Sequence, residues 1–246
     1  MPSLFADLAA ACPAVTAGRR PPGLPPRSTL TPIRTRPFLD LVAALLPVLA
    51  ALGRGLAPAR ADVSKNLARL AAAAAAAAPP GALDGDVRLI AAAELAAVGG
   101  DAAALHGSTS AAKALLWLVR TLAFVAGVLR GVASSEGGDG RGAKPPALGA
   151  VAREAYAATL RPYHGSVTGA AVSAALAFAP GRASFWAAVG CEGAGGGGGG
   201  GGGGDGGGGA ATAAEVAAFL AAFDPILAQL QAYLTEAGLD DPTPVR

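Results

Sequence analysis

Apolar residues recur along most of this chain at intervals of three and four, which is the spacing of one face of an α-helix. The clearest runs are Phe38, Leu41, Val42, Leu45, Leu46 and Leu49, and Val216, Leu220, Phe223, Leu227, Leu230 and Leu234. No long segment alternates apolar and polar residues with a period of two, which is typical of strands. The pattern therefore predicts an all-α fold.

Proline and glycine mark where these helices begin and end. A helix is expected to start at Pro37, and Pro47 is expected to kink it or end its first half. Pro79-Pro80-Gly81, Gly99-Gly100 and Pro180-Gly181 are stop signals. Further helices are predicted over residues 61–78, 86–98, 110–133, 148–160, 165–178, 183–189 and 211–237.

Two segments are predicted to lie outside the folded domain. Residues 1–31 contain Pro-Pro-Gly-Leu-Pro-Pro, which cannot hold a long helix, and are expected to form a flexible N-terminal tail. Residues 195–209 are almost entirely glycine, a composition typical of a flexible tether, and are interpreted as an insert in a loop. The domain itself is expected to span residues 32–246.

Composition supports one large apolar core and excludes some partners. Hydrophobic residues make up 52% of the chain and charged residues 15%. The net charge of +2, without a basic stripe among aromatics, argues against nucleic acid. Cys12 and Cys191 have no metal-ligand spacing and are interpreted as reduced and inert, which suits a cytoplasmic protein. The N-terminal arginines leave organelle targeting open.

The very apolar stretch at residues 111–134 raises the question of a membrane span. Lys113, Arg120 and Arg130 interrupt it, and the uncharged stretch 41–53 is shorter than the ~20 residues that a span needs. Both are interpreted as core helices of a soluble protein.

One predicted helix carries a row of polar side chains. Asp62, Asn66 and Arg69 stand at i, i+4 and i+7 and share a face, while Val63, Leu67 and Leu70 form the apolar stripe beside them. An acid, an amide and a guanidinium together suit a neutral ligand rich in hydroxyl groups. The alternative is that they are ordinary solvent-facing residues.

Three further residues are candidates for the same site, each with an ordinary alternative. Trp117 is either a packed aromatic or a stacking surface for a sugar ring, and Arg120 follows it one turn later. His164 is either a packed residue or a donor to a buried acceptor. No metal-ligand or paired-carboxylate motif is present, and no cofactor is expected.

The order of these motifs resembles the glycolipid transfer protein family. The matching segments are Pro-Phe-Leu-Asp (37–40), Asp-x-x-x-Asn-x-x-Arg (62–69), Leu-Trp-Leu-x-Arg (116–120), Tyr-x-x-x-Leu-x-x-Tyr-His-Gly (156–165) and Ala-x-Ala-Pro (177–180). The resemblance implies a two-layer, all-helical sandwich with a pocket for two hydrocarbon chains. It also implies nonenzymatic transfer of a sphingolipid, with transient contact at a membrane surface.

The resemblance implies a role for each candidate. The residue matching Asp62 binds the ceramide amide and a sugar hydroxyl, and those matching Asn66 and Arg69 bind sugar hydroxyls. The residue matching Trp117 stacks on the sugar, and the one matching His164 binds the amide carbonyl. Because the ceramide-1-phosphate branch has basic residues where this chain has Asn66 and Trp117, a glycosphingolipid such as glucosyl- or galactosylceramide is implied.

The chain also departs from the family pattern. Ser166 replaces a tryptophan that helps typical members dock on membranes, and Trp186 is either its substitute or a packed residue.

Three alternatives remain beside a glycolipid carrier. Ceramide-1-phosphate transfer is the second candidate, because Arg69 and Arg120 together suit a phosphate. A lipid sensor binds the same ligand without transferring it. A hydrolase is disfavoured because Gly165-Ser166-Val167-Thr168-Gly169 places its serine one position too early for a nucleophile elbow.

Overall fold

The computed structural model describes residues 3–18, 31–76, 85–107, 109–136, 145–191 and 207–244. Within that part of the chain every regular element is helical, so the all-α prediction is confirmed. The elements are α1 (Leu4–Thr16), α2 (Thr35–Ala44), α3 (Leu46–Ala51), η1 (Arg54–Leu56), α4 (Ala57–Ala76), α5 (Val87–Ala97), α6 (Ala103–His106), α7 (Ala111–Glu136), α8 (Leu148–Thr159), η3 (Arg161–Tyr163), α9 (Ser166–Ala177), α10 (Arg182–Ala188) and α11 (Gly207–Glu236). The break between α2 and α3 falls beside Pro47, as expected.

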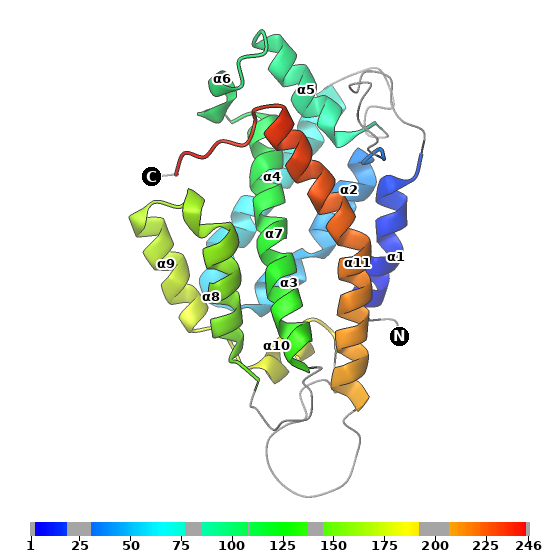
Figure 1. Ribbon diagram of the computed structural model, residues 1–246, viewed down its shortest axis with the longest axis vertical. Coiled ribbons are helices and arrows are strands. Elements are labelled where there is room, and N and C mark those ends of the chain that lie inside the picture. Colours follow the sequence, from blue (N-terminus) through cyan, green and yellow to red (C-terminus); the bar gives the residue numbers. More distant parts are fainter. Residues whose placement is uncertain are drawn as a thin grey trace, which may run out of the picture.

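Helix α7 is the centre of the fold. It packs against α11, α8, α4 and α5, and Figure 1 shows it running between α8 and α11 with α2 and α3 behind. Helices α7, α8 and α11 in front and the α2–α4 group behind make the two layers of a helical sandwich.

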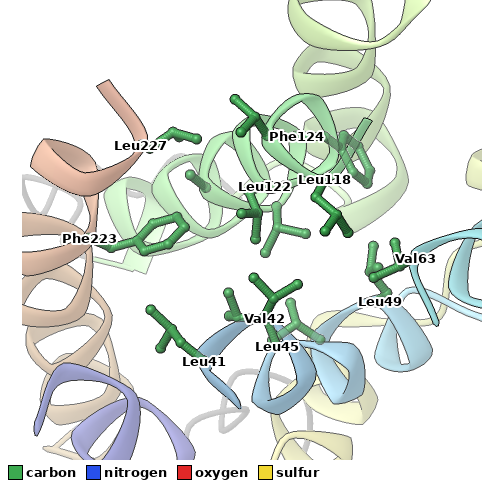
Figure 2. Packing of buried hydrophobic residues seen from close by; sticks show 14 of the residues in the cluster. Leu41, Val42, Leu45, Leu49, Val63, Leu118, Leu122, Phe124, Phe223 and Leu227 are labelled. Carbon is green, nitrogen blue, oxygen red and sulfur yellow. The ribbon is translucent and has the colours of Figure 1, made fainter. Parts of the chain in front are cut away.

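The two layers meet through large aliphatic side chains. Leu41 and Val42 of α2, with Leu45 at its end, face Leu118 and Leu122 of α7 (Figure 2). All of them are buried, and each such side chain contributes roughly 1.5–3 kcal/mol by leaving water. Apolar contact along this seam therefore holds the layers together.

Small residues let α8 lie unusually close to α7. A Cβ added at Gly131 would stand 2.6 Å from Val151 Cγ1, and one at Gly127 would stand 3.1 Å from Ala155 Cβ. Because the two glycines are one turn apart, they form a flat strip on α7 for α8 to rest on. The closeness of α8 places its C-terminal end beside the middle of α7.

The prediction of a flexible tail is wrong for Leu4–Thr16. These residues form α1, which packs on α11 and α2, and the Ser3 hydroxyl caps it by accepting a bond from Ala6 N at 3.2 Å. Phe5, Leu8, Cys12 and Val15 are buried, at the spacing of one helix face. The proline-rich stretch lies after this helix, and residues 19–30 lie outside the described residues.

The predicted glycine insert, residues 195–209, lies only partly within the described residues. Residues 192–206, which hold most of the predicted insert, lie outside the described part. Gly207, Gly208 and Gly209 belong to the first turn of α11, which therefore begins earlier than predicted.

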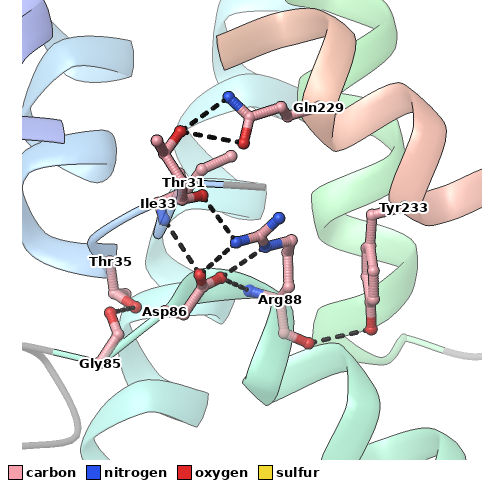
Figure 3. A network of polar contacts seen from close by, with 8 residues as sticks. All are labelled: Thr31, Ile33, Thr35, Gly85, Asp86, Arg88, Gln229 and Tyr233. Carbon is pink, nitrogen blue, oxygen red and sulfur yellow. Dashed lines mark hydrogen bonds and ion pairs between the residues drawn. The ribbon is translucent and has the colours of Figure 1, made fainter. Parts of the chain in front are cut away.

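A buried polar network ties distant segments together (Figure 3). Asp86 accepts hydrogen bonds from Ile33 N at 3.0 Å and from Arg88 Nε at 2.9 Å, and Arg88 Nη2 lies 2.6 Å from the carboxylate oxygen Oδ2. Arg88 also donates to Thr31 O, and its own carbonyl accepts from the Tyr233 hydroxyl. The network joins the segment before α2 to α5 and α11, and burial raises the pKa of Tyr233 to about 12.

Two helices, Ala111–Ser134 and Thr212–Glu236, are long and apolar enough to cross a membrane. The first has 72% of its most apolar window buried inside the protein, as expected for a core helix. The second packs against both α7 and α1.

Candidate functional site

A cavity of about 670 Å³ opens between α4, α7, α8 and α9. Five of the six predicted ligand-binding residues line it: Asp62, Asn66, Arg69, Trp117 and His164. Apolar side chains form another part of the wall: Leu49, Leu56, Phe124, Leu160 and Val172. Along α7 the lining residues change from Lys113 and Trp117 to Thr121 and Phe124, and the part of the wall around Lys113, Trp117 and the α4 row is called the polar end below.

The polar row on α4 forms a chain of hydrogen bonds, as its helical spacing predicts. Asn66 Nδ2 donates to Asp62 Oδ2 at 3.0 Å, and Arg69 Nη1 donates to Asn66 Oδ1 at 3.1 Å. Asn66 is buried, whereas Asp62 is exposed. Because Asn66 is held on both sides, its amide is oriented between the carboxylate of Asp62 and the guanidinium of Arg69, and all three residues line the cavity.

Trp117 and His164 form another part of the polar end. Their rings stack with centroids 5.7 Å apart and planes at 18°. The Tyr156 hydroxyl lies 2.8 Å from His164 Nδ1, which leaves Nε2 as the nitrogen that Tyr156 does not engage. Residues 161–163 form the short η3 turn that carries His164 back over α7.

His164 is neutral near pH 7. Burial lowers the pKa of its imidazole, and the positive charges of Arg161 and Arg120 lower it further, while Asp62 acts in the opposite direction. When the Tyr156 hydroxyl donates to Nδ1, the single ring proton is on Nε2. The imidazole is then a hydrogen-bond donor without a charge.

Arg120 lies behind the cavity wall rather than on it. Its guanidinium lies 3.4 Å from the ring centroid of Tyr163 and 5.3 Å from that of Trp117. Nη2 donates to Asp240 Oδ1 at 2.8 Å and to the carbonyl of Asp241. Arg120 therefore contacts Trp117 and the C-terminal segment, and its assignment as a ligand-binding residue stays a prediction.

Sequence reasoning missed Lys113 and Asp241, which both line the cavity. Lys113 Nζ donates to Asp241 Oδ2 at 2.6 Å, and His106 Nδ1 lies 3.7 Å from the other oxygen. Burial pushes the pKa of the Asp241 carboxyl up, but hydrogen bonds from Lys113 and Thr243 and the Lys113 charge outweigh it and hold the pKa well below its usual value. Lys113 stands one helical turn before Trp117, and this spacing indicates from the sequence that the two side chains share one face of the helix.

Trp186 does not form an exposed docking surface. It is 1% exposed and packs edge-on against Phe5 and Phe185, so the packed alternative is correct. The large apolar side chains that are exposed in the described part are Val167 and Phe178, at the two ends of α9.

The cysteines agree with their prediction as far as the structure describes them. Cys12 and Cys191 are both buried free thiols. Burial raises the pKa of the Cys12 thiol to about 11 and also raises that of Cys191, so neither is a thiolate near neutral pH.

Comparisons with known proteins agree with the geometry. The family model described as Glycolipid transfer protein (GLTP) matches residues 33–191. Glycolipid transfer protein 1 of Arabidopsis thaliana is 24% identical over 207 residues, which cover 84% of this chain and 86% of that protein. Glycolipid transfer protein 2 of the same plant is 26% identical over 166 residues, covering 68% of this chain and 67% of that protein.

Solved structures share the fold. The one that describes how FAPP2 selects simple glycosphingolipids using the GLTP-fold has a TM-score of 0.74 at 24% identity and covers 99% of this chain and 100% of that one. The mouse ceramide-1-phosphate transfer protein in its apo form has a TM-score of 0.71 at 16% identity and covers 96% of this chain and 98% of that one.

Proposed function

Because the chain belongs to the glycolipid transfer protein family, whose members transfer lipids and are not enzymes, we propose that it carries glycosphingolipids between membranes without changing them chemically. The observation that carries this proposal is one cavity whose wall combines a hydrogen-bonding row on α4, Trp117 and His164 with apolar side chains such as Leu56 and Phe124. A lipid with a sugar headgroup has the same division between a hydroxyl-rich end and hydrocarbon chains.

The polar end suits a neutral headgroup and a ceramide amide. Asp62 accepts from a hydroxyl or an amide N–H, Asn66 both donates and accepts, and Arg69 donates. Neutral His164 offers its Nε2 proton to the amide carbonyl. The indole of Trp117 offers an apolar surface to a sugar ring.

The apolar part of the wall leads into the seam between the two layers. Leu49 and Thr121 line the cavity and also a gap of about 10 Å³ between α2, α3, α4 and α7, whose other walls are apolar. The gap is too small for a hydrocarbon chain, so a chain that continues from the cavity into the seam requires the layers to separate there. The aliphatic packing between the layers is then exchanged for packing against the hydrocarbon chain, which offsets the cost of separation.

Contact with a membrane is expected to be transient and to involve the cavity mouth. The exposed Val167 and Phe178 flank α9, whose Thr168 and Val172 line the cavity. We infer that these two apolar side chains contact the bilayer when a lipid enters. We also infer a cytoplasmic location, which the buried free thiols support.

A transfer competition tests the proposal. Donor vesicles hold labelled galactosylceramide and labelled ceramide-1-phosphate, and arrival in acceptor vesicles is followed for each. We expect galactosylceramide to move faster and both lipids to be recovered uncleaved. Failure to move either lipid, together with tight binding, would instead identify a sensor, and cleaved product would identify an enzyme.

Ceramide-1-phosphate remains the second candidate ligand. Arg69 and Lys113 line the cavity, and Arg120 lies against Trp117 with its guanidinium 5.3 Å from the indole centroid, so three cations lie close to the place that a phosphate would occupy. The same competition distinguishes it, because a phosphate site predicts preferential transfer of ceramide-1-phosphate.

A further inference from the structure

The cations at the polar end of the cavity are not equally available. Lys113 Nζ is 2.6 Å from Asp241, and Arg120 Nη2 is 2.8 Å from Asp240. Arg69 instead donates to the neutral amide of Asn66. Two adjacent carboxylates from the last described segment of the chain thus neutralise two of the three cations.

The position of these carboxylates follows from how α11 ends. Gly238 has φ +69°, a left-handed conformation that glycine adopts without strain, and Leu239 N donates to Leu234 O at 2.8 Å. The chain therefore turns back and runs over α7. Thr243 N donates to Asp241 Oδ1 at 2.9 Å, which orients the carboxylate towards Lys113.

Asp241 belongs to the cavity and does more than anchor the C-terminal segment. It lines the wall together with Lys113, Thr243 and Pro244, while its side chain is only 4% exposed. A negative charge held in a partly desolvated wall is screened much less than one on the surface. A headgroup bound beside Trp117 therefore meets Asp241 and Lys113 as a pair, in which the carboxylate cancels the attraction that Lys113 alone would offer an anion.

We propose that Asp240 and Asp241 form a charge filter that rejects anionic headgroups and leaves neutral ones unaffected. The inference rests on the proposed function and deepens it by naming the residues that set headgroup charge selectivity. A phosphate carries ~1.5–2 negative charges near pH 7, so Asp241 repels it and competes with it for the Lys113 ammonium. A neutral sugar has no charge for Asp241 to repel, so the filter does not act on it.

The charge filter predicts a change in the ratio of the two lipids transferred, which a purely structural role of Asp240 and Asp241 does not predict. Loosening the C-terminal segment would weaken the transfer of every lipid alike. Removing the filter charge instead raises transfer of ceramide-1-phosphate relative to galactosylceramide, because Lys113 then becomes free to bind an anion.

The test compares Asp241→Asn and Asp240→Asn with the wild type in the two-lipid transfer assay. Asp224→Asn is the matched control, since Asp224 pairs with Arg130 on the exposed surface at 2.8 Å and its loss changes net charge equally. We expect Asp241→Asn to raise the ratio of ceramide-1-phosphate to galactosylceramide transfer about tenfold, a change of about 1.4 kcal/mol. Asp240→Asn should act in the same direction but less, because its side chain is 41% exposed.

A double variant separates the filter from other effects of the substitution. In Lys113→Met/Asp241→Asn the gain should disappear, since no ammonium remains to bind the phosphate. Thermal unfolding of each variant shows which of them fold.

The outcomes fall into distinct classes. An unchanged lipid ratio in folded Asp241→Asn and Asp240→Asn overturns the charge filter, as does a gain that persists in the double variant or an equal gain in Asp224→Asn. A wild-type protein that transfers neither lipid overturns the proposed function instead.

Discussion

Replacement of Asp62 by valine separates headgroup recognition from folding. In the free protein Asp62 is exposed and accepts a hydrogen bond from Asn66 Nδ2 at 3.0 Å. Because this hydrogen bond is part-buried and Asn66 keeps its bond from Arg69, its loss lowers the free energy of unfolding by about 1 kcal/mol. In the proposed complex, however, the same carboxylate accepts the ceramide amide N–H, so its loss leaves a buried donor unpaired.

The size of the binding defect follows from that unpaired donor. An unsatisfied buried polar group costs about 1–3 kcal/mol, which corresponds to roughly five- to 150-fold weaker binding. We therefore expect Asp62→Val to unfold at nearly the wild-type temperature but to transfer galactosylceramide at least about fivefold more slowly. Circular dichroism measures unfolding, and energy transfer between labelled lipids measures the transfer rate.

Asp224→Val is the control for Asp62→Val. It removes a helical carboxylate that also accepts hydrogen bonds, at 2.8 and 3.0 Å from Arg130, but lies away from the cavity wall. Transfer by this control should match the wild type. Near-wild-type transfer by Asp62→Val would refute the assignment of Asp62 to the headgroup, whereas loss of transfer with loss of folding would show that Asp62 is needed for the fold itself.

Four further predictions concern other parts of the molecule. Because the folded-state pKa of His164 lies below the ordinary 6.5, the unfolded chain binds a proton first as pH falls. The contribution of His164 to the free energy of unfolding should therefore be constant above about pH 7 and decline below 6.5. His164→Gln should flatten that decline when unfolding by urea is measured at a series of pH values. Thr121→Trp, which fills the entrance to the seam, should slow transfer of long-chain lipids about tenfold while sparing a two-carbon acyl analogue, and equal slowing of both would contradict the proposed route. Asp86→Ala should lower the free energy of unfolding by about 3–5 kcal/mol, because buried Arg88 then loses its counter-charge, and a near-neutral result would show that water reaches it. Trp186→Phe should leave vesicle binding in a flotation assay unchanged, whereas a marked loss would restore its docking role.

Most helices could be predicted from the sequence because their long apolar repeats fit the helical spacing of three and four residues and not the strand spacing of two. Residues such as Leu118 and Leu122 recur one turn apart, and the runs that contain them became helices. The proline-rich residues 21–26 predict a tail without a long helix, but they follow α1 and do not limit the helix formed by Leu4–Thr16. The spacing of Phe5, Leu8, Cys12 and Val15 already carried the helical signal.

The candidate site was predictable where its geometry is local. Asp62, Asn66 and Arg69 share one helix, so their spacing alone places them in a row. The direction of a side chain on a long core helix depends on its neighbours, and Arg120 turned towards a segment far away in sequence. Lys113 and Asp241 meet only because Gly238 reverses the chain, and periodicity does not reveal which surface such a segment crosses.

The two tryptophans give the protein an internal optical reference. Trp186 is sealed among Phe5 and Phe185, so its emission depends on the integrity of the fold, whereas Trp117 sits beside an imidazole on the cavity wall. Unlabelled lipid entering the cavity should therefore alter one fluorophore and leave the other constant. Occupancy of the cavity by lipid can then be measured from tryptophan fluorescence without an added dye. The Trp117→Phe variant is the control, because it lacks the fluorophore in the cavity wall.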